Sequence, residues 1–212
     1  MIYVIMCAGK YDKWQTPKHL TPIKGEPIVA RTIRLLRECG AENIAISTNQ
    51  PGFDGFGVEV IHNETTYRLG LEHGYGAWLD AFVKTDEPTC YLFGDVVFSK
   101  EAIRTIVKTE TDSVEFFASA PPFGEHYIKP WAEPFAYKVV DTKLFFDSIE
   151  RAKRYDEEGC FYRMAVSWEL WQVIKRTPLN RIDYTNYTVI NDWTCDIDDQ
   201  DDIKKIEVWV NG

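Results

Sequence analysis

The chain has 212 residues, of which 45% are hydrophobic and 27% charged, and its formal net charge is −9. This composition excludes a disordered or fibrous protein, and the length predicts a single domain over residues 1–212. The acidic balance argues against a nucleic-acid partner, because a nucleic-acid binder normally presents a basic face.

Cysteine usage and the first apolar run predict a cytoplasmic protein without a membrane partner. The five cysteines are scattered, form no CxxC pair and are odd in number, which is typical of reduced thiols. The opening run "MIYVIMCAG" lacks a basic leader and is too short for a signal peptide or a membrane span. We expect it to form a buried strand.

Hydrophobic periodicity predicts alternating strands and helices in the first half of the chain. Apolar runs of strand length lie at residues 2–6, 43–48, 58–61 and 89–93. Apolar residues at helical spacing predict helices over residues 27–40, 71–85 and 100–109. Ser99 is expected to cap the last of these helices. Strands that alternate with helices and are buried on both faces imply a largely parallel sheet.

The second half is less regular and predicts an antiparallel extension of the sheet. Strands are expected at residues 113–120, 136–140 and 187–193, and helices at 142–155, 164–176 and 199–209. The last helix begins behind Asp199, a suitable capping residue. Together the two halves predict an α/β fold, a three-layer sandwich with a mixed, mostly parallel central sheet.

Ligands of open α/β sheets bind at the carboxyl ends of the strands, and three segments are expected there. They are the loop "CAGKYDKWQTPKHL", the Gly94-Asp95 pair, and the acidic run "CDIDDQDD" near residue 200.

The loop after the first strand is suited to a triphosphate. Ala8 and Gly9 allow the backbone to approach a ligand, and successive amides can form an anion-binding concavity. Positive charge would come from three lysines: Lys10, Lys13 and Lys18. The alternative is a solvated loop whose lysines face water. Lys18 is the strongest candidate of the three, because Pro17 fixes the chain just before it.

Three carboxylates are candidate ligands for a divalent cation. Asp95 follows a strand and a Gly, although its position alone favours a turn residue that caps the loop. Asp199 and Asp202 suit the start of the last helix, but helix capping does not explain Asp196 and Asp198. These two lie on the same side of an extended segment, so that one of them could complete a metal site with Asp95.

Other polar and aromatic residues carry weaker signals. The four histidines lack the spacing of metal ligands, and we expect His19 at the surface. The tryptophans are expected in the core or in a pocket wall. Four aromatic residues could wall an acceptor pocket, although core packing would explain them equally well: Tyr127, Trp131, Phe135 and Tyr162.

The first 48 residues resemble the N-terminal half of the GT-A type sugar-phosphate nucleotidyltransferases. The shared features are Ala8-Gly9, Lys13, Pro17-Lys18, Leu20 and Gly25-x-Pro27. The strand "YLFGDVVF" and the closing "DIDDQDDI" are similar to two further segments of that family. Two features depart from the family pattern: "GKYDKW" replaces its Gly-x-Gly-x-Arg loop, and Asp199-Gln200 replaces a Thr-Pro pair.

The resemblance implies a nucleotide-diphospho-sugar transferase fold, which is Rossmann-like, and a role for each matching residue. Lys18, Lys13 and Lys129 would be catalytic. The nucleotide would be bound by Ala8, Gly9, Lys10, Gly74 and Gly76. Asp95 and Asp198 would hold Mg²⁺, and Asp196 is the alternative to Asp198.

The implied reaction is attack by a substrate phosphate on the α-phosphorus of a nucleoside triphosphate, with release of pyrophosphate. The short chain and its acidic ending favour CTP and an acceptor that is a sugar phosphate or a small phospho-alcohol. The alternatives are a GT-A glycosyltransferase that uses a nucleotide sugar, and an inactive nucleotide-binding regulatory domain. A homo-oligomer remains open.

Overall fold

The computed structural model describes residues 1–9, 14, 16–64, 76–122 and 130–210. The strands are β1 (Ile2–Met6), β2 (Pro22–Ile23), β3 (Glu26–Pro27), β4 (Ile44–Thr48), β5 (Glu59–His62), β6 (Thr89–Phe93), β7 (Val96–Val97), β8 (Val114–Ala118), β9 (Pro134–Val139), β10 (Thr188–Val189) and β11 (Cys195–Asp196). The helices are α1 (Ile28–Glu38), α2 (Gly76–Leu79), α3 (Lys100–Lys108), α4 (Thr142–Glu157), α5 (Ser167–Lys175) and α6 (Gln200–Trp209), with single 3₁₀ turns η1 (Lys18–Leu20) and η2 (Asp54–Phe56).

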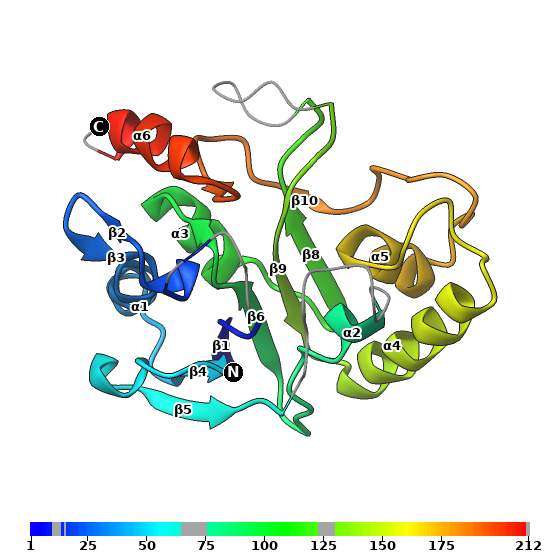
Figure 1. The fold of residues 1–212 in the computed structure, drawn as a ribbon. Coiled ribbons are helices and arrows are strands. Elements are labelled where there is room, and N and C mark those ends of the chain that lie inside the picture. The colour runs from blue at the N-terminus through cyan, green and yellow to red at the C-terminus, as the bar shows by residue number, and fades with distance from the viewer. Residues whose placement is uncertain (10–13, 15, 65–75, 123–129, 211–212) are drawn as a thin grey trace.

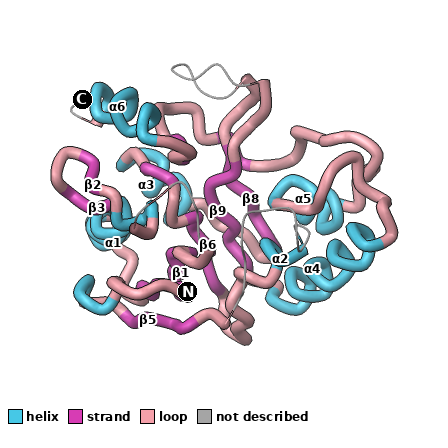
Figure 2. The backbone as a smooth tube through the Cα atoms, in the orientation of Figure 1, coloured by secondary structure: helices cyan, strands magenta, loops and turns pink. Residues whose placement is uncertain are grey.

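A seven-stranded sheet with the order β10-β8-β9-β6-β1-β4-β5 forms the centre of the molecule (Figure 2). β1 runs parallel to both β4 and β6, β4 parallel to β5, and β8 parallel to β10. β9 lies between β6 and β8 and is antiparallel to both. The mixed, mostly parallel sheet is therefore confirmed, and β9 supplies the antiparallel extension.

Helices cover the sheet from both sides. α1 and α3 pack together on one side, and α2 and α5 each pack against α4 on the other (Figure 1). On α1, the apolar residues at helical spacing, among them Ile28, Ile33 and Leu36, are all buried. The predicted three-layer arrangement is confirmed. None of the described helices has the length and hydrophobicity that a membrane span requires.

The core follows from the apolar runs that the sequence shows. All five residues of β4 and of β6 are buried, as a parallel sheet covered on both faces requires. Phe135 belongs to this core, since it is fully buried and its ring lies 6.4 Å from that of Phe98. Its assignment to an acceptor pocket is therefore wrong.

Two predicted helix caps are present in the structure. The Ser99 side chain accepts a hydrogen bond from the amide of Ala102 at the start of α3. The Asp199 side chain accepts from the amides of Asp201 and Asp202 at the start of α6. Both residues satisfy amide groups that a helix leaves without an internal partner.

Three elements are shorter than the sequence predicts. The helix expected over residues 71–85 ends at Leu79 in α2, while residues 71–75 lie outside the described part of the chain. One tertiary hydrogen bond competes with helix formation after that point, because Asn63 donates to the Ala81 carbonyl, which a helix through residue 85 would use internally; the Tyr91 hydroxyl donates to the Val83 carbonyl further on. α5 begins at residue 167 and β10 covers residues 188–189 only.

Candidate active site

The candidate site lies where the strand order changes direction. The chain passes from β1 to β4 on one side, and later returns to β6 on the other side of β1. The carboxyl ends of parallel strands on either side of such a point border a crevice that binds ligands in open α/β sheets. The expected position of the site at this edge therefore agrees with the topology.

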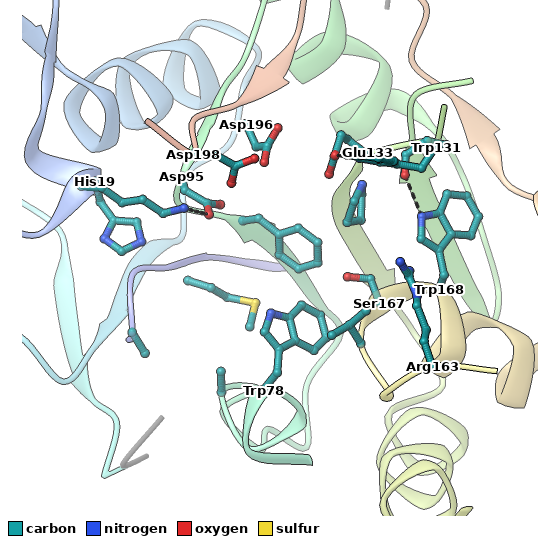
Figure 3. A pocket seen from close by; sticks show the side chains of 18 residues that line it. His19, Trp78, Asp95, Trp131, Glu133, Arg163, Ser167, Trp168, Asp196 and Asp198 are labelled. Atoms are coloured by element: carbon teal, nitrogen blue, oxygen red, sulfur yellow. Dashed lines mark hydrogen bonds and ion pairs between the residues drawn. The ribbon is translucent and has the colours of Figure 1, made fainter. Parts of the chain in front are cut away.

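A small antiparallel ladder carries the acidic run to this edge. β7, which begins directly after Asp95, pairs with β11, so that Val96 lies opposite Asp196 and Val97 opposite Cys195. The Ile197 amide also donates to the Asp95 carbonyl at 3.0 Å. Residues about 100 positions apart thus become neighbours, and Asp95, Asp196 and Asp198 line one pocket (Figure 3).

Lys18 joins the loop after β1 to this acidic cluster. Its Nζ lies 2.6 Å from Asp95 Oδ2 and donates to the Ile197 carbonyl at 3.0 Å. The Lys18 side chain is only 3% exposed, whereas that of Asp95 is 22% exposed and faces the pocket. The Lys18 amine therefore links the segment that carries Asp95 to the one that carries Ile197, and it lines the same pocket.

Lys18 and Asp95 stabilise each other's charged form. Burial alone would lower the pKa of Lys18, but the neighbouring carboxylates, above all Asp95, raise it above its usual value. Burial alone would raise the pKa of Asp95, and the Lys18 ammonium outweighs that effect and lowers it. Both groups therefore carry their charges at neutral pH.

Asp202 fixes the loop that carries Asp198. It is buried, and its Oδ2 accepts hydrogen bonds from the amides of Asp198 and Asp199 at 3.0 and 3.3 Å. The acidic run thus divides between two tasks. Asp199 and Asp202 organise the start of α6, while Asp196 and Asp198 face the pocket.

Gly94 has no space for a side chain, and His19 lies buried beside it. A Cβ on Gly94 would lie 2.5 Å from the Met6 carbonyl and 2.7 Å from Cys7 Sγ, so a larger residue does not fit without displacement. His19 is buried rather than at the surface, since only 2% of it is exposed. Burial, aided by the Lys18 charge against the opposing effect of Asp95, lowers the pKa of His19 to about 4.

The predicted nucleotide-binding and catalytic residues are only partly described. Ala8 lines the pocket, and the Gly9 amide donates to Asn49 Oδ1 at 3.0 Å with a φ of 109° that favours glycine. Gly76 is the first residue of α2. The remaining candidates lie outside the described residues: Lys10, Lys13, Gly74 and Lys129.

The other end of the pocket was not predicted, apart from its tryptophans. It is lined by Trp131, Glu133, Arg163, Ser167 and Trp168, and Trp78 of α2 also faces the cavity (Figure 3). Trp131 is 43% exposed, and its indole N–H donates to the carboxylate of Glu133. Tyr162, proposed as a wall residue, is 73% exposed and does not line this pocket.

The acidic end fits a hard divalent cation whose ligands come partly from the protein and partly from a substrate. Among the described residues, no group of three or more His, Cys, Asp or Glu side chains is arranged to hold a metal ion by itself. Mg²⁺ needs less from the protein, because it typically takes one or two carboxylates and completes its shell with phosphate oxygens and water. The donors that line this pocket, Asp95, Asp196 and Asp198, are of that kind.

Solved structures share this fold along nearly the whole chain. A Bacillus anthracis protein that is assigned as a glucose-1-phosphate thymidylyltransferase was solved in complex with sucrose. It is 16% identical over 98% of this chain and 94% of its own, with a TM-score of 0.59. The 4-diphosphocytidyl-2C-methyl-D-erythritol synthase of Anaerococcus prevotii is 11% identical over 100% and 96%, with a TM-score of 0.58. A hypothetical transferase of Thermus thermophilus is 15% identical over 95% and 98%, with a TM-score of 0.58. No curated protein matches the chain significantly.

The chain thus shares with these structures an α/β fold in which helices cover both faces of a mixed, mostly parallel sheet. A family model described as the MobA-like NTP transferase domain matches residues 3–164, well over half of the chain. The chain belongs to this family and is a nucleotidyltransferase. The match includes β1, Lys18 and Asp95, whereas α5 and the acidic run at residues 195–202 lie beyond it.

Proposed function

We propose that this nucleotidyltransferase transfers a nucleoside monophosphate, with CTP as the favoured donor, to the phosphate of a sugar phosphate or small phospho-alcohol. Pyrophosphate is the leaving group, and the reaction requires Mg²⁺. The observation that carries the proposal is the meeting of Lys18, Asp95 and the 196–198 segment in one pocket beside β1. A triphosphate needs such a combination of cationic and metal-binding groups.

In this proposal Asp95 and Asp198 hold the cation, with Asp196 as the alternative to Asp198. Mg²⁺ bound there would neutralise charge that develops on the phosphate oxygens during transfer. Lys18 stabilises the phosphorus centre under attack and keeps Asp95 ionised through their ion pair. Gly9 and Ala8 bring the backbone near the nucleotide, and the acceptor phosphate needs no general base because it is already an anion.

The shape of the cavity supports a compact acceptor. Its volume is about 280 Å³, which suits a small molecule rather than a large one. The exposed Trp131 offers a flat apolar face, and the Glu133 carboxylate beside it can accept hydrogen bonds from hydroxyl groups.

The test is a screen of pyrophosphate release with four nucleoside triphosphates against a panel of phospho-sugars and phospho-alcohols, in the presence of Mg²⁺. We expect one triphosphate and one acceptor class to give turnover, and Asp95→Asn to lower it by about 10²–10³-fold. Asp54→Asn is the matched control, because Asp54 is an exposed acid on η2. Unchanged turnover in Asp95→Asn would remove Asp95 from the site.

The same screen separates the alternatives. Consumption of a nucleotide sugar without pyrophosphate release would identify a glycosyltransferase. Nucleotide binding without turnover across the whole panel would identify a regulatory domain.

A further inference from the structure

A second ion pair lies at the α5 end of the pocket, and its polarity is the reverse of the first. At the acidic end both partners line the cavity, but Lys18 is only 3% exposed and the carboxylate of Asp95 is the more exposed of the two at 22%. At the α5 end the carboxylate of Glu169 is only 2% exposed, while Arg163 is 42% exposed and lines the cavity. The pocket therefore presents the carboxylates of Asp95, Asp196 and Asp198 at one end, and at the other end a guanidinium group together with the Glu133 carboxylate (Figure 3).

Glu169 determines how Arg163 is presented. Its Oε1 accepts a hydrogen bond from Arg163 Nε at 2.7 Å, and its Oε2 accepts from the Val166 amide at 3.1 Å. One buried carboxylate thus fixes both the guanidinium group and the start of α5. Among the described residues, the two η nitrogens of Arg163 have no hydrogen-bond partner. They are donors in a fixed plane, the geometry that suits an oxyanion.

Ser167 adds a second donor at the same place. It is the first residue of α5, is 2% exposed and lines the cavity. Its carbonyl accepts from the Tyr137 hydroxyl at 2.5 Å, whereas its own hydroxyl has no partner within the described part of the chain. The residue is almost entirely enclosed, yet its hydroxyl is not among the fully buried unpaired atoms, so it is open to the cavity and can donate a hydrogen bond to a ligand group there.

The first turn of α5 completes this set of donors. α5 has nine residues, and its first amides have no partner inside the helix. Amides at a helix N-terminus favour negative charge. A guanidinium group, a hydroxyl and helix amides meet here, and each of them can donate a hydrogen bond to an anion.

We propose that Arg163, Ser167 and the N-terminal amides of α5 form an oxyanion subsite for the acceptor, and that Glu169 is its positioning residue. The subsite takes a phosphate or carboxylate group. It rests on the proposed function for the identity of its ligand as the acceptor. In this proposal the acidic end of the pocket binds the metal and the nucleotide, and the α5 end binds the acceptor.

The test measures binding directly, so that it does not depend on turnover. Tryptophan fluorescence titrations would use three probes: inorganic phosphate, glycerol 3-phosphate and 3-phosphoglycerate. We expect Arg163→Gln to weaken binding at least tenfold and Ser167→Ala severalfold, with the affinity for nucleoside triphosphate unchanged. Arg154→Gln is the matched control, because Arg154 is exposed on α4.

The probes distinguish which acidic group occupies the subsite. An equal loss for all three probes assigns it to the acceptor phosphate, and a loss confined to 3-phosphoglycerate assigns it to a second acidic group. Wild-type affinity for every probe in both Arg163→Gln and Ser167→Ala would overturn the proposal. Ser167→Ala leaves the Arg163–Glu169 pair intact, which guards against a general loss of structure in the other variant.

Once an acceptor is known, Glu169→Gln tests the positioning role. We expect a KM for the acceptor raised about tenfold, with kcat and the KM for the nucleotide unchanged, and partial recovery in Glu169→Asp. A structural defect would instead change all three constants together. Absence of turnover with every triphosphate would refute the proposed function but would leave the binding measurements valid.

Discussion

The two ends of the pocket use the same kind of ion pair with the buried partner exchanged. Lys18 is 3% exposed behind Asp95, and Glu169 is 2% exposed behind Arg163. In each pair the buried member orients the other and neutralises part of its charge. The fold therefore decides which partner of each pair is the more exposed to a ligand, and the net charge of the chain does not reveal it.

The ends also differ in how tightly they are built. The acidic end is formed by the close approach of β1, β6 and the β7–β11 ladder, and a buried histidine and a glycine without space for a side chain lie within it. The α5 end is formed by the start of α5, by Trp131 and Glu133, and by an arginine whose side chain is 42% exposed. We expect substitutions at the acidic end to affect stability and chemistry together.

Breaking the ion pair at the acidic end is expected to have the largest effect. Asp95→Ala leaves the buried Lys18 amine without its closest counter-charge, so we expect the free energy of unfolding to fall by about 3–5 kcal/mol. The double variant Asp95→Ala with Lys18→Met removes both charges and should recover part of this loss. Urea denaturation of the wild type and the variants measures the difference. A double variant less stable than Asp95→Ala would contradict a buried, mutually dependent pair.

Lowering the pH is expected to affect the acidic end more than the α5 end. Among the described lining residues of the pocket, the one histidine is His19, at the acidic end. Burial lowers the pKa of His19 from 6.5 to about 4. Between pH 6.5 and 4, His19 is therefore protonated in the unfolded chain but neutral in the folded chain. The contribution of His19 to stability is complete above pH 6.5 and is lost as the pH falls towards 4. With a pKa shift of about 2.5, the loss amounts to about 3 kcal/mol.

Denaturation curves at several pH values between 7 and 4.5 test this expectation. The wild type should lose stability across this range, and the loss should be much smaller in His19→Gln. Equal slopes in the two proteins would mean that other groups cause the dependence.

Packing at Gly94 gives the smallest of the three effects. In Gly94→Ala the new methyl group would meet the Met6 carbonyl at 2.5 Å, so β1 or β6 must shift, and we expect a loss of about 1–3 kcal/mol. Gly55→Ala is the matched control, because a Cβ there has no neighbour within 4 Å among the described atoms. It should remain within about 0.5 kcal/mol of the wild type. Thermal unfolding of both variants measures the difference, and equal midpoints would contradict the close approach of β1 and β6.

Sequence patterns predicted the acidic end better than the α5 end. Local patterns made Asp95, Asp196 and Asp198 candidates, although the position of Asp95 alone favours a turn residue. The resemblance to the nucleotidyltransferases then assigned the metal role to Asp95 and Asp198. Arg163, Ser167 and Glu169 lie in "YRMAVSWEL", which contains no Gly-rich or metal-ligand pattern. A capping signal is present in Glu169, three residues after Val166, but it indicates a helix start and not a ligand site.

Local chemistry explains where single residues were misplaced. His19 was expected at the surface, yet the Phe53 ring and Gly94 lie against it and it is buried. The helix expected through residue 85 stops at Leu79, and beyond it the Asn63 side chain binds the Ala81 carbonyl that a longer helix would use. In both cases the deciding partner lies outside the short window over which periodicity is read.

The amino-acid sequence by itself determined the parallel strands β1, β4 and β6, the apolar face of α1 and the caps of α3 and α6, because these depend on spacing and side chains within a few residues. Only the tertiary structure decided that Asp95 meets Asp196 and Asp198, since the β7–β11 ladder joins segments about 100 residues apart. It also decided that Lys18 and Glu169 are buried while Asp95 and Arg163 face the cavity. Burial depends on the whole packed molecule, so the pocket acquires this arrangement of charged groups only when the chain has folded.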